Sequence, residues 1–106
     1  MKSSFPPLRI PDWCMASISS LAQSRYSRNR PEVLERANHL SECMKRIPPW
    51  TTIRCVQLFI EAQDLGTHLR RIRGPKHWIY ATDTILRYCQ YSGTLPLELQ
   101  ARLRDQ

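Results

Sequence analysis

Prolines and glycines divide this chain into segments that each carry a helical apolar period. The breaks fall at Pro31, at Pro48-Pro49 and at Gly74-Pro75. Between the breaks, apolar stripes with steps of three and four positions are formed by Val33, Ala37, Leu40, Met44 and Ile47, by Cys55, Leu58, Ala62, Leu65, Leu69 and Ile72, and by Trp78, Thr82, Ile85 and Cys89. These steps are typical of amphipathic helices, and no segment shows the sustained alternation that a strand needs. The sequence therefore predicts an all-α fold.

The spacing predicts one compact bundle of four to five helices. The expected helices span residues 12–27, 31–47, 51–73 and 75–91, followed by a short helix from Thr94. The three helices between residues 31 and 91 are expected to form the core, with the first and last packed across it. Residues 1–11 contain three prolines and are expected to form an extended tail. A single helical domain is expected over residues 12–106, because a chain of 106 residues has room for one small domain.

The helix over residues 51–73 is expected to be the most buried, since its N-terminal half is apolar nearly all round. Gly66 within it costs about 1 kcal/mol relative to Ala, so a close approach of another helix is expected there. Trp78 lies on the inward stripe of the next helix, and we expect core packing for it rather than stacking on a base.

The excess positive charge lies in two blocks. The chain has 16 Lys+Arg against 9 Asp+Glu, a net charge of +7. Residues 1–30 and 68–106 each carry a net +4, whereas residues 31–67 carry −1. Clusters of cations concentrate polyanions near them and give salt-dependent binding. The first block is Arg25, Arg28 and Arg30 around Tyr26, and the second is Arg70, Arg71, Arg73 and Lys76 beside His68 and His77.

These two blocks predict a non-enzymatic accessory or regulatory protein that binds nucleic acid through arginine–phosphate contacts, with RNA favoured over DNA. Such binding is largely independent of base sequence. Of the 16 basic residues 13 are Arg, whose planar fork suits phosphate, although a codon constraint explains the same bias equally well. The composition is also common among small viral accessory proteins. Whether the two blocks share one face is left open by the sequence.

A protein surface is the alternative partner. The basic blocks would suit an acidic protein surface, and an adaptor could dock a host or partner protein in an apolar groove. Trp13 would then be an exposed anchor, although a lid over the core is the more ordinary role for it. A homodimer is compatible with either interpretation, because the helix over residues 51–73 is very apolar for so small a monomer.

Enzymatic, cofactor-binding and metal-binding functions are not predicted. The chain has three glycines and neither a Gly-rich phosphate loop nor a Gly-x-Ser-x-Gly motif. His39 and Cys43 share a helix face, and Cys55 would face them across a hairpin. A Cys43–Cys55 disulfide or a three-ligand metal site is therefore feasible, but a structural zinc site needs four ligands. Reduced core thiols are the expectation.

The sequence indicates an intracellular protein, cytoplasmic or nuclear, that does not span a membrane. No apolar run approaches the roughly 20 residues of a transmembrane helix. The N-terminus, Met1 to Pro7, has no apolar core of a secretory signal.

Overall fold

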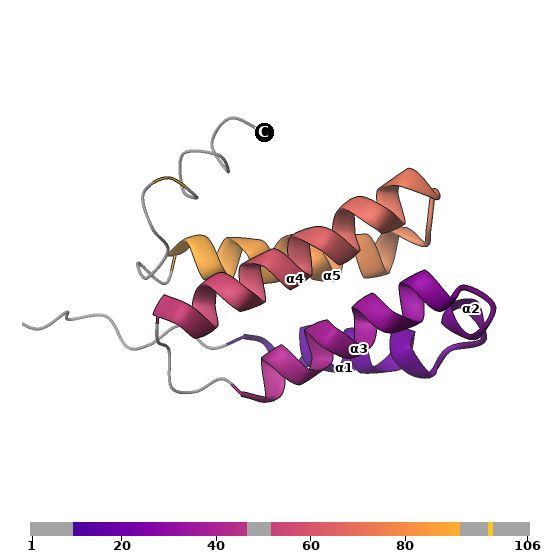
Figure 1. The fold of residues 1–106 in the computed structure, drawn as a ribbon, viewed down its shortest axis with the longest axis horizontal. Helices are drawn as coiled ribbons and strands as arrows, with labels where there is room; N and C mark the ends of the chain where they lie inside the picture. The colour runs from indigo at the N-terminus through magenta and orange to yellow at the C-terminus, as the bar shows by residue number, and fades with distance from the viewer. Residues whose placement is uncertain (1–9, 47–51, 92–97, 99–106) are drawn as a thin grey trace, which may run out of the picture.

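The computed structural model describes residues 10–46, 52–91 and 98, and the regular elements within these residues are all helical. The helices are α1 (Asp12–Gln23), α2 (Arg25–Arg28), α3 (Pro31–Lys45), α4 (Thr52–Arg71) and α5 (Lys76–Tyr91) (Figure 1). The predicted all-α bundle is thus confirmed. Most of the predicted tail, the predicted last helix apart from Glu98, and Trp50 lie outside the described residues.

Four helices form a closed bundle in which neighbours run antiparallel. In Figure 1, α3 and α4 lie in front and α1 and α5 behind. Helix α4 packs on α3 and α5, and α1 packs on the same two helices from the other side. The first helix is therefore a full member of the bundle, and the prediction that it packs across a three-helix core is wrong. Three of its apolar side chains, Cys14, Ile18 and Leu21, are fully buried in the core.

The predicted apolar stripes form the core. Leu40, Leu65 and Ile85 are fully buried, and Trp78 is buried among them as expected. Burying a side chain of this size contributes about 1.5–3 kcal/mol. Ile10, which precedes α1, is also buried, so the chain joins the core before its first helix begins.

Helices α4 and α5 approach closely at Gly66, as its place in the sequence predicts. A Cβ added to Gly66 would lie 2.7 Å from the Thr82 Oγ1 atom, well inside van der Waals contact. The Thr82 hydroxyl donates to the carbonyl of Ile79 at 2.7 Å, which keeps a buried polar group satisfied. The absence of a side chain at Gly66 therefore lets the two helices pack closely.

A serine ends the first helix earlier than predicted. Helix α1 stops at Gln23, and Ser24 adopts an extended conformation with ψ 156°. Its Oγ donates to the carbonyl of Leu21 at 2.6 Å and accepts from the backbone N–H of Ser27 at 3.2 Å. A serine that satisfies backbone groups in this way competes with helix continuation and caps the next helix. The chain therefore breaks at Ser24 and restarts as the short α2, which leads into α3.

Helix α4 is not buried on all sides, which corrects the expectation for its N-terminal half. Ile53 is 74% exposed and Ile60 is 51% exposed. The reason is geometric: among the described helices α4 packs closely on α3 and α5, and Ile53 and Ile60 lie outside these two contacts.

Candidate nucleic-acid interface

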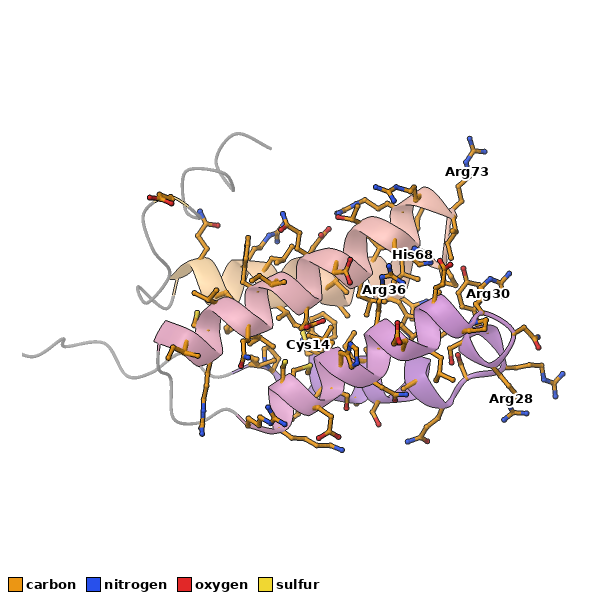
Figure 2. The ribbon with its side chains drawn as sticks, in the orientation of Figure 1. Cys14, Arg28, Arg30, Arg36, His68 and Arg73 are labelled. Carbon is orange, nitrogen blue, oxygen red and sulfur yellow. The ribbon has the colours of Figure 1, made fainter. Side chains whose placement is uncertain are left out.

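Tyr26 joins the two basic blocks at one end of the bundle. Its ring packs against Trp78 of α5, with centroids 5.5 Å apart. It also lies against the α4–α5 corner, since a Cβ on Gly74 would be 3.0 Å from the Tyr26 hydroxyl. Figure 2 shows Arg28, Arg30 and Arg73 at this same end. Blocks that are far apart in sequence are therefore neighbours in the fold.

We call this surface the basic end. Its members are six exposed cations of α2, the α2–α3 junction and the α4–α5 corner, namely Arg25, Arg28, Arg30, Arg71, Arg73 and Lys76. None of the six forms an ion pair with another described residue. Their charges are therefore available to an external anion.

Arg30 is held by contacts with Tyr26. Its guanidinium lies over the Tyr26 ring, 3.9 Å from the centroid, and Nη1 donates to the Tyr26 carbonyl at 3.1 Å. A cation over an aromatic face is attracted by the ring quadrupole. In Figure 2, by contrast, Arg28 extends from α2 into solvent. The block thus combines one anchored arginine with two exposed arginines on α2.

The corner of the second block carries a backbone conformation that disfavours arginine. Arg73 has φ 54°, and it is the one non-glycine residue with positive φ in the described part of the chain. The N–H of Gly74 donates to the Leu69 carbonyl at 2.7 Å, and that of Arg73 to the Arg70 carbonyl at 3.1 Å. This is a Schellman motif, in which glycine usually occupies the position of Arg73. Arg73 therefore projects from the corner despite a local backbone cost.

Arg70 is exposed like the other cations, but it is paired within the fold. Its Nη2 atom donates to both carboxylate oxygens of Asp83 on α5 at 2.6 Å. This pair ties the end of α4 to α5 and neutralises the charge that the sequence assigned to phosphate binding. We therefore leave Arg70 out of the basic end and describe it as a clamp between two helices.

Two ion pairs connect α3 to α4 beside the basic end. Arg36 Nε lies 3.2 Å from Asp64 Oδ2, although its angle does not make a hydrogen bond. One turn away, His68 Nε2 lies 3.6 Å from Glu32 Oε2, so this contact is an ion pair when the imidazole is protonated. An open hollow of about 370 Å³ lies next to them and is lined by Arg30, Pro31, Glu32, His68 and Ile72.

Trp13 is an exposed side chain rather than a lid over the core. It is 44% exposed and stacks on Tyr80 of α5, with centroids 5.6 Å apart and ring planes 13° apart. Tyr80 is itself 56% exposed. No functional prediction for Tyr80 followed from the sequence. Its position four residues after Lys76, on the same face of the helix, was the available signal.

The four cysteines are thiols, and none is in a disulfide. Cys55 Sγ donates to the Cys89 carbonyl at 3.7 Å, so this hydrogen bond joins α4 to α5. Burial raises the pKa of Cys14 to about 11. The pKa of Cys89 is raised further by its side-chain hydrogen bond with Cys55 and by burial. These thiols stay protonated at neutral pH and are therefore poor nucleophiles.

Within residues 10–46 and 52–91 no three His, Cys, Asp or Glu side chains are grouped as metal ligands. No described helix is both long and apolar enough to cross a membrane. Comparisons with family models, curated proteins and solved structures found no match for this chain. The case for a function therefore rests on the geometry of the basic end.

Proposed function

We propose that this protein binds nucleic acid, with RNA the favoured ligand, through phosphate contacts at the basic end. The observation that carries the proposal is the Tyr26–Trp78 contact, which places two separate arginine blocks side by side. An anion that reaches one block therefore meets the field of the other, and the effects of neighbouring cations add.

The state of the cations supports the same proposal. The six cations of the basic end are exposed and form no ion pair with a described residue, whereas Asp83 of α5 is paired with Arg70. Arginine also matches phosphate oxygens with a bidentate fork. Contacts to the phosphate backbone of the nucleic acid carry no information about the base sequence. Binding should therefore depend little on that sequence.

The proposal predicts a steep dependence on salt. If about six phosphates are neutralised, the affinity for a single strand falls a few hundred-fold, and that for a duplex about a thousand-fold, between about 50 and about 200 mM salt. A fluorescence anisotropy titration of labelled RNA and DNA oligonucleotides over this range measures the slope. If no binding were detected at about 50 mM salt, the proposal would be overturned.

A pair of double variants tests the location. Arg28→Ala/Arg73→Ala removes two exposed charges at the basic end. Lys45→Ala/Arg46→Ala removes two exposed charges at the C-terminal end of α3, of which Lys45 is ion-paired with Glu42, and is the control for the loss of two positive charges. We expect the first variant to weaken binding about tenfold or more and to lower the salt slope by nearly two, and the control to change both much less. Equal losses in both variants would contradict a site at the basic end.

An acidic protein surface is the competing partner, and a third arm distinguishes it. Polyglutamate of matched charge presents carboxylates without phosphates or bases. If it binds as tightly as the oligonucleotide at equal salt, the basic end recognises acidic chains in general, and the nucleic-acid proposal fails.

A further inference from the structure

The most exposed aromatic surface among the described residues lies beside the basic end. Trp13 of α1 and Tyr80 of α5 stack on each other in nearly parallel planes, yet about half of each side chain is open to solvent. Aromatic side chains bury large areas when they pack, and pairs of them usually sit inside a core or an interface. We call these two rings the aromatic platform.

The platform continues the cationic surface along α5. Tyr80 follows Lys76, the α5 member of the basic end, by one helical turn, which is a rise of about 6 Å. That distance is less than two nucleotide steps at the roughly 3.4 Å spacing of a stacked strand. Arg87, two turns further on, is also exposed. A strand whose phosphates lie on Lys76 therefore brings its next bases to Tyr80.

The platform itself carries little net positive charge. Asp83 lies one turn beyond Tyr80 and is paired with Arg70, and Asp12 next to Trp13 is exposed without an ion pair to a described residue. Phosphates are not drawn to such a surface. Flat apolar rings flanked by cations instead fit the face of a base, with the phosphates outside on Lys76 and Arg87.

From this arrangement we infer that the nucleic acid bound at the basic end is single-stranded and that unpaired bases stack on the Trp13–Tyr80 platform. This inference rests on the proposed function and specifies its ligand. A duplex keeps its base faces inside the stack, so it can use the cations but not the platform. Stacking on an aromatic ring is tolerant of base identity, because every base has a π-face.

The test compares three ligands of equal phosphate number at low salt: an RNA single strand, an abasic strand of the same length, and a blunt RNA duplex. We expect the wild type to bind the base-bearing strand about 5- to 100-fold more tightly than the abasic strand, the range found for stacking on one side chain. Tyr80→Ala should lower this ratio several-fold, because one of the two rings of the platform is lost. Tyr80→Phe should keep most of it, because the ring remains.

Ile60→Ala is the matched control, since Ile60 is about as exposed as Tyr80 but lies on α4. It should leave the ratio unchanged. Circular dichroism and urea unfolding of every variant confirm that the fold is retained, as expected for an exposed position.

The outcomes separate this inference from the proposed function. If the wild type binds none of the three ligands, both fail. If it binds all three with similar affinity, or if Tyr80→Ala keeps the wild-type ratio, the basic end stands and the stacking inference is overturned. If Tyr80→Ala changes the sedimentation coefficient but not the ratio, a second copy of this chain covers the platform, and the inference is again overturned.

Discussion

The ring of Tyr26 packs against the ring of Trp78, with centroids 5.5 Å apart and planes inclined by 51°. Trp78 belongs to the core, whereas Tyr26 is half-buried on α2. This contact, together with the approach of the Tyr26 hydroxyl to Gly74, attaches α2 to the α4–α5 corner. The arrangement of the basic end therefore depends on an aromatic pair and not on any attraction between the cations, which repel one another.

Removing the Tyr26 ring should loosen the basic end. We expect Tyr26→Ala to lower the free energy of unfolding by about 2 kcal/mol, because a half-buried aromatic ring loses its contacts with Trp78 and with Arg30. Urea unfolding followed by circular dichroism measures the change. Tyr26→Phe keeps the ring and should stay within about 0.5 kcal/mol of wild type. Equal destabilisation by both substitutions would show that the hydroxyl, and not the ring, holds α2 in place.

Gly66 offers a test of the α4–α5 contact. Gly66→Ala should destabilise the protein by about 1–2 kcal/mol, although alanine is the better helix former by about 1 kcal/mol, because the new Cβ meets Thr82 Oγ1 at 2.7 Å. Thermal or urea unfolding shows whether the free energy of unfolding falls, as the clash predicts, or rises, as helix propensity alone predicts. The double variant Gly66→Ala/Thr82→Ala makes room for the Cβ and should recover most of the loss. If it does not recover, the clash is with something other than Thr82.

The helices and the core could be predicted because they depend on local pattern. Stripe residues such as Leu40, Leu65 and Ile85 are fully buried as their spacing predicts. The contact between helices at Gly66 could be predicted in the same way. Glycine lowers the stability of a helix interior, so its presence there indicates that another helix comes close. Ile53 and Ile60 are exposed because burial also depends on the number of neighbours, which periodicity alone does not reveal.

The candidate site was only partly predictable. Its cations were visible as two blocks, but their meeting depends on the break at Ser24 and on a ring contact between residues far apart in sequence. The pairing of Arg70 with Asp83 likewise required the register of α4 against α5. The aromatic platform forms across α1 and α5, and no local pattern reports which helices are neighbours.

The buried thiol of Cys14 should make stability fall at alkaline pH. Burial raises its pKa from 9.0 to about 11 in the folded chain. The folded state then holds a proton that the unfolded state releases, so the contribution to stability is full below about pH 9 and is lost between about pH 9 and 11. Unfolding free energies measured across this window should fall less steeply for Cys14→Ala than for wild type. Parallel pH profiles would contradict this assignment.

Arg73 should show a conflict between stability and binding. Its φ of 54° is unfavourable for any side chain with a Cβ and favourable for glycine. We expect Arg73→Gly to raise the free energy of unfolding by about 0.5–1 kcal/mol, since relief of the backbone cost exceeds the added entropy of the unfolded chain. The same substitution should weaken oligonucleotide binding several-fold, because a charge is lost at the basic end. Urea unfolding and anisotropy on one preparation measure both effects.

Two further substitutions at this position separate backbone from charge. Arg73→Lys keeps both the positive charge and the backbone cost, so it should retain wild-type stability and the salt slope of binding while weakening any bidentate phosphate contact. Arg73→Ala removes the charge without relieving the backbone, so it should weaken binding as Arg73→Gly does and gain no stability. If Arg73→Gly stabilised the protein and left binding intact, the arginine at this corner would have no part in anion recognition. Stabilisation with weaker binding would instead mean that a charge is kept at the corner at the expense of stability, as expected where local strain serves a function.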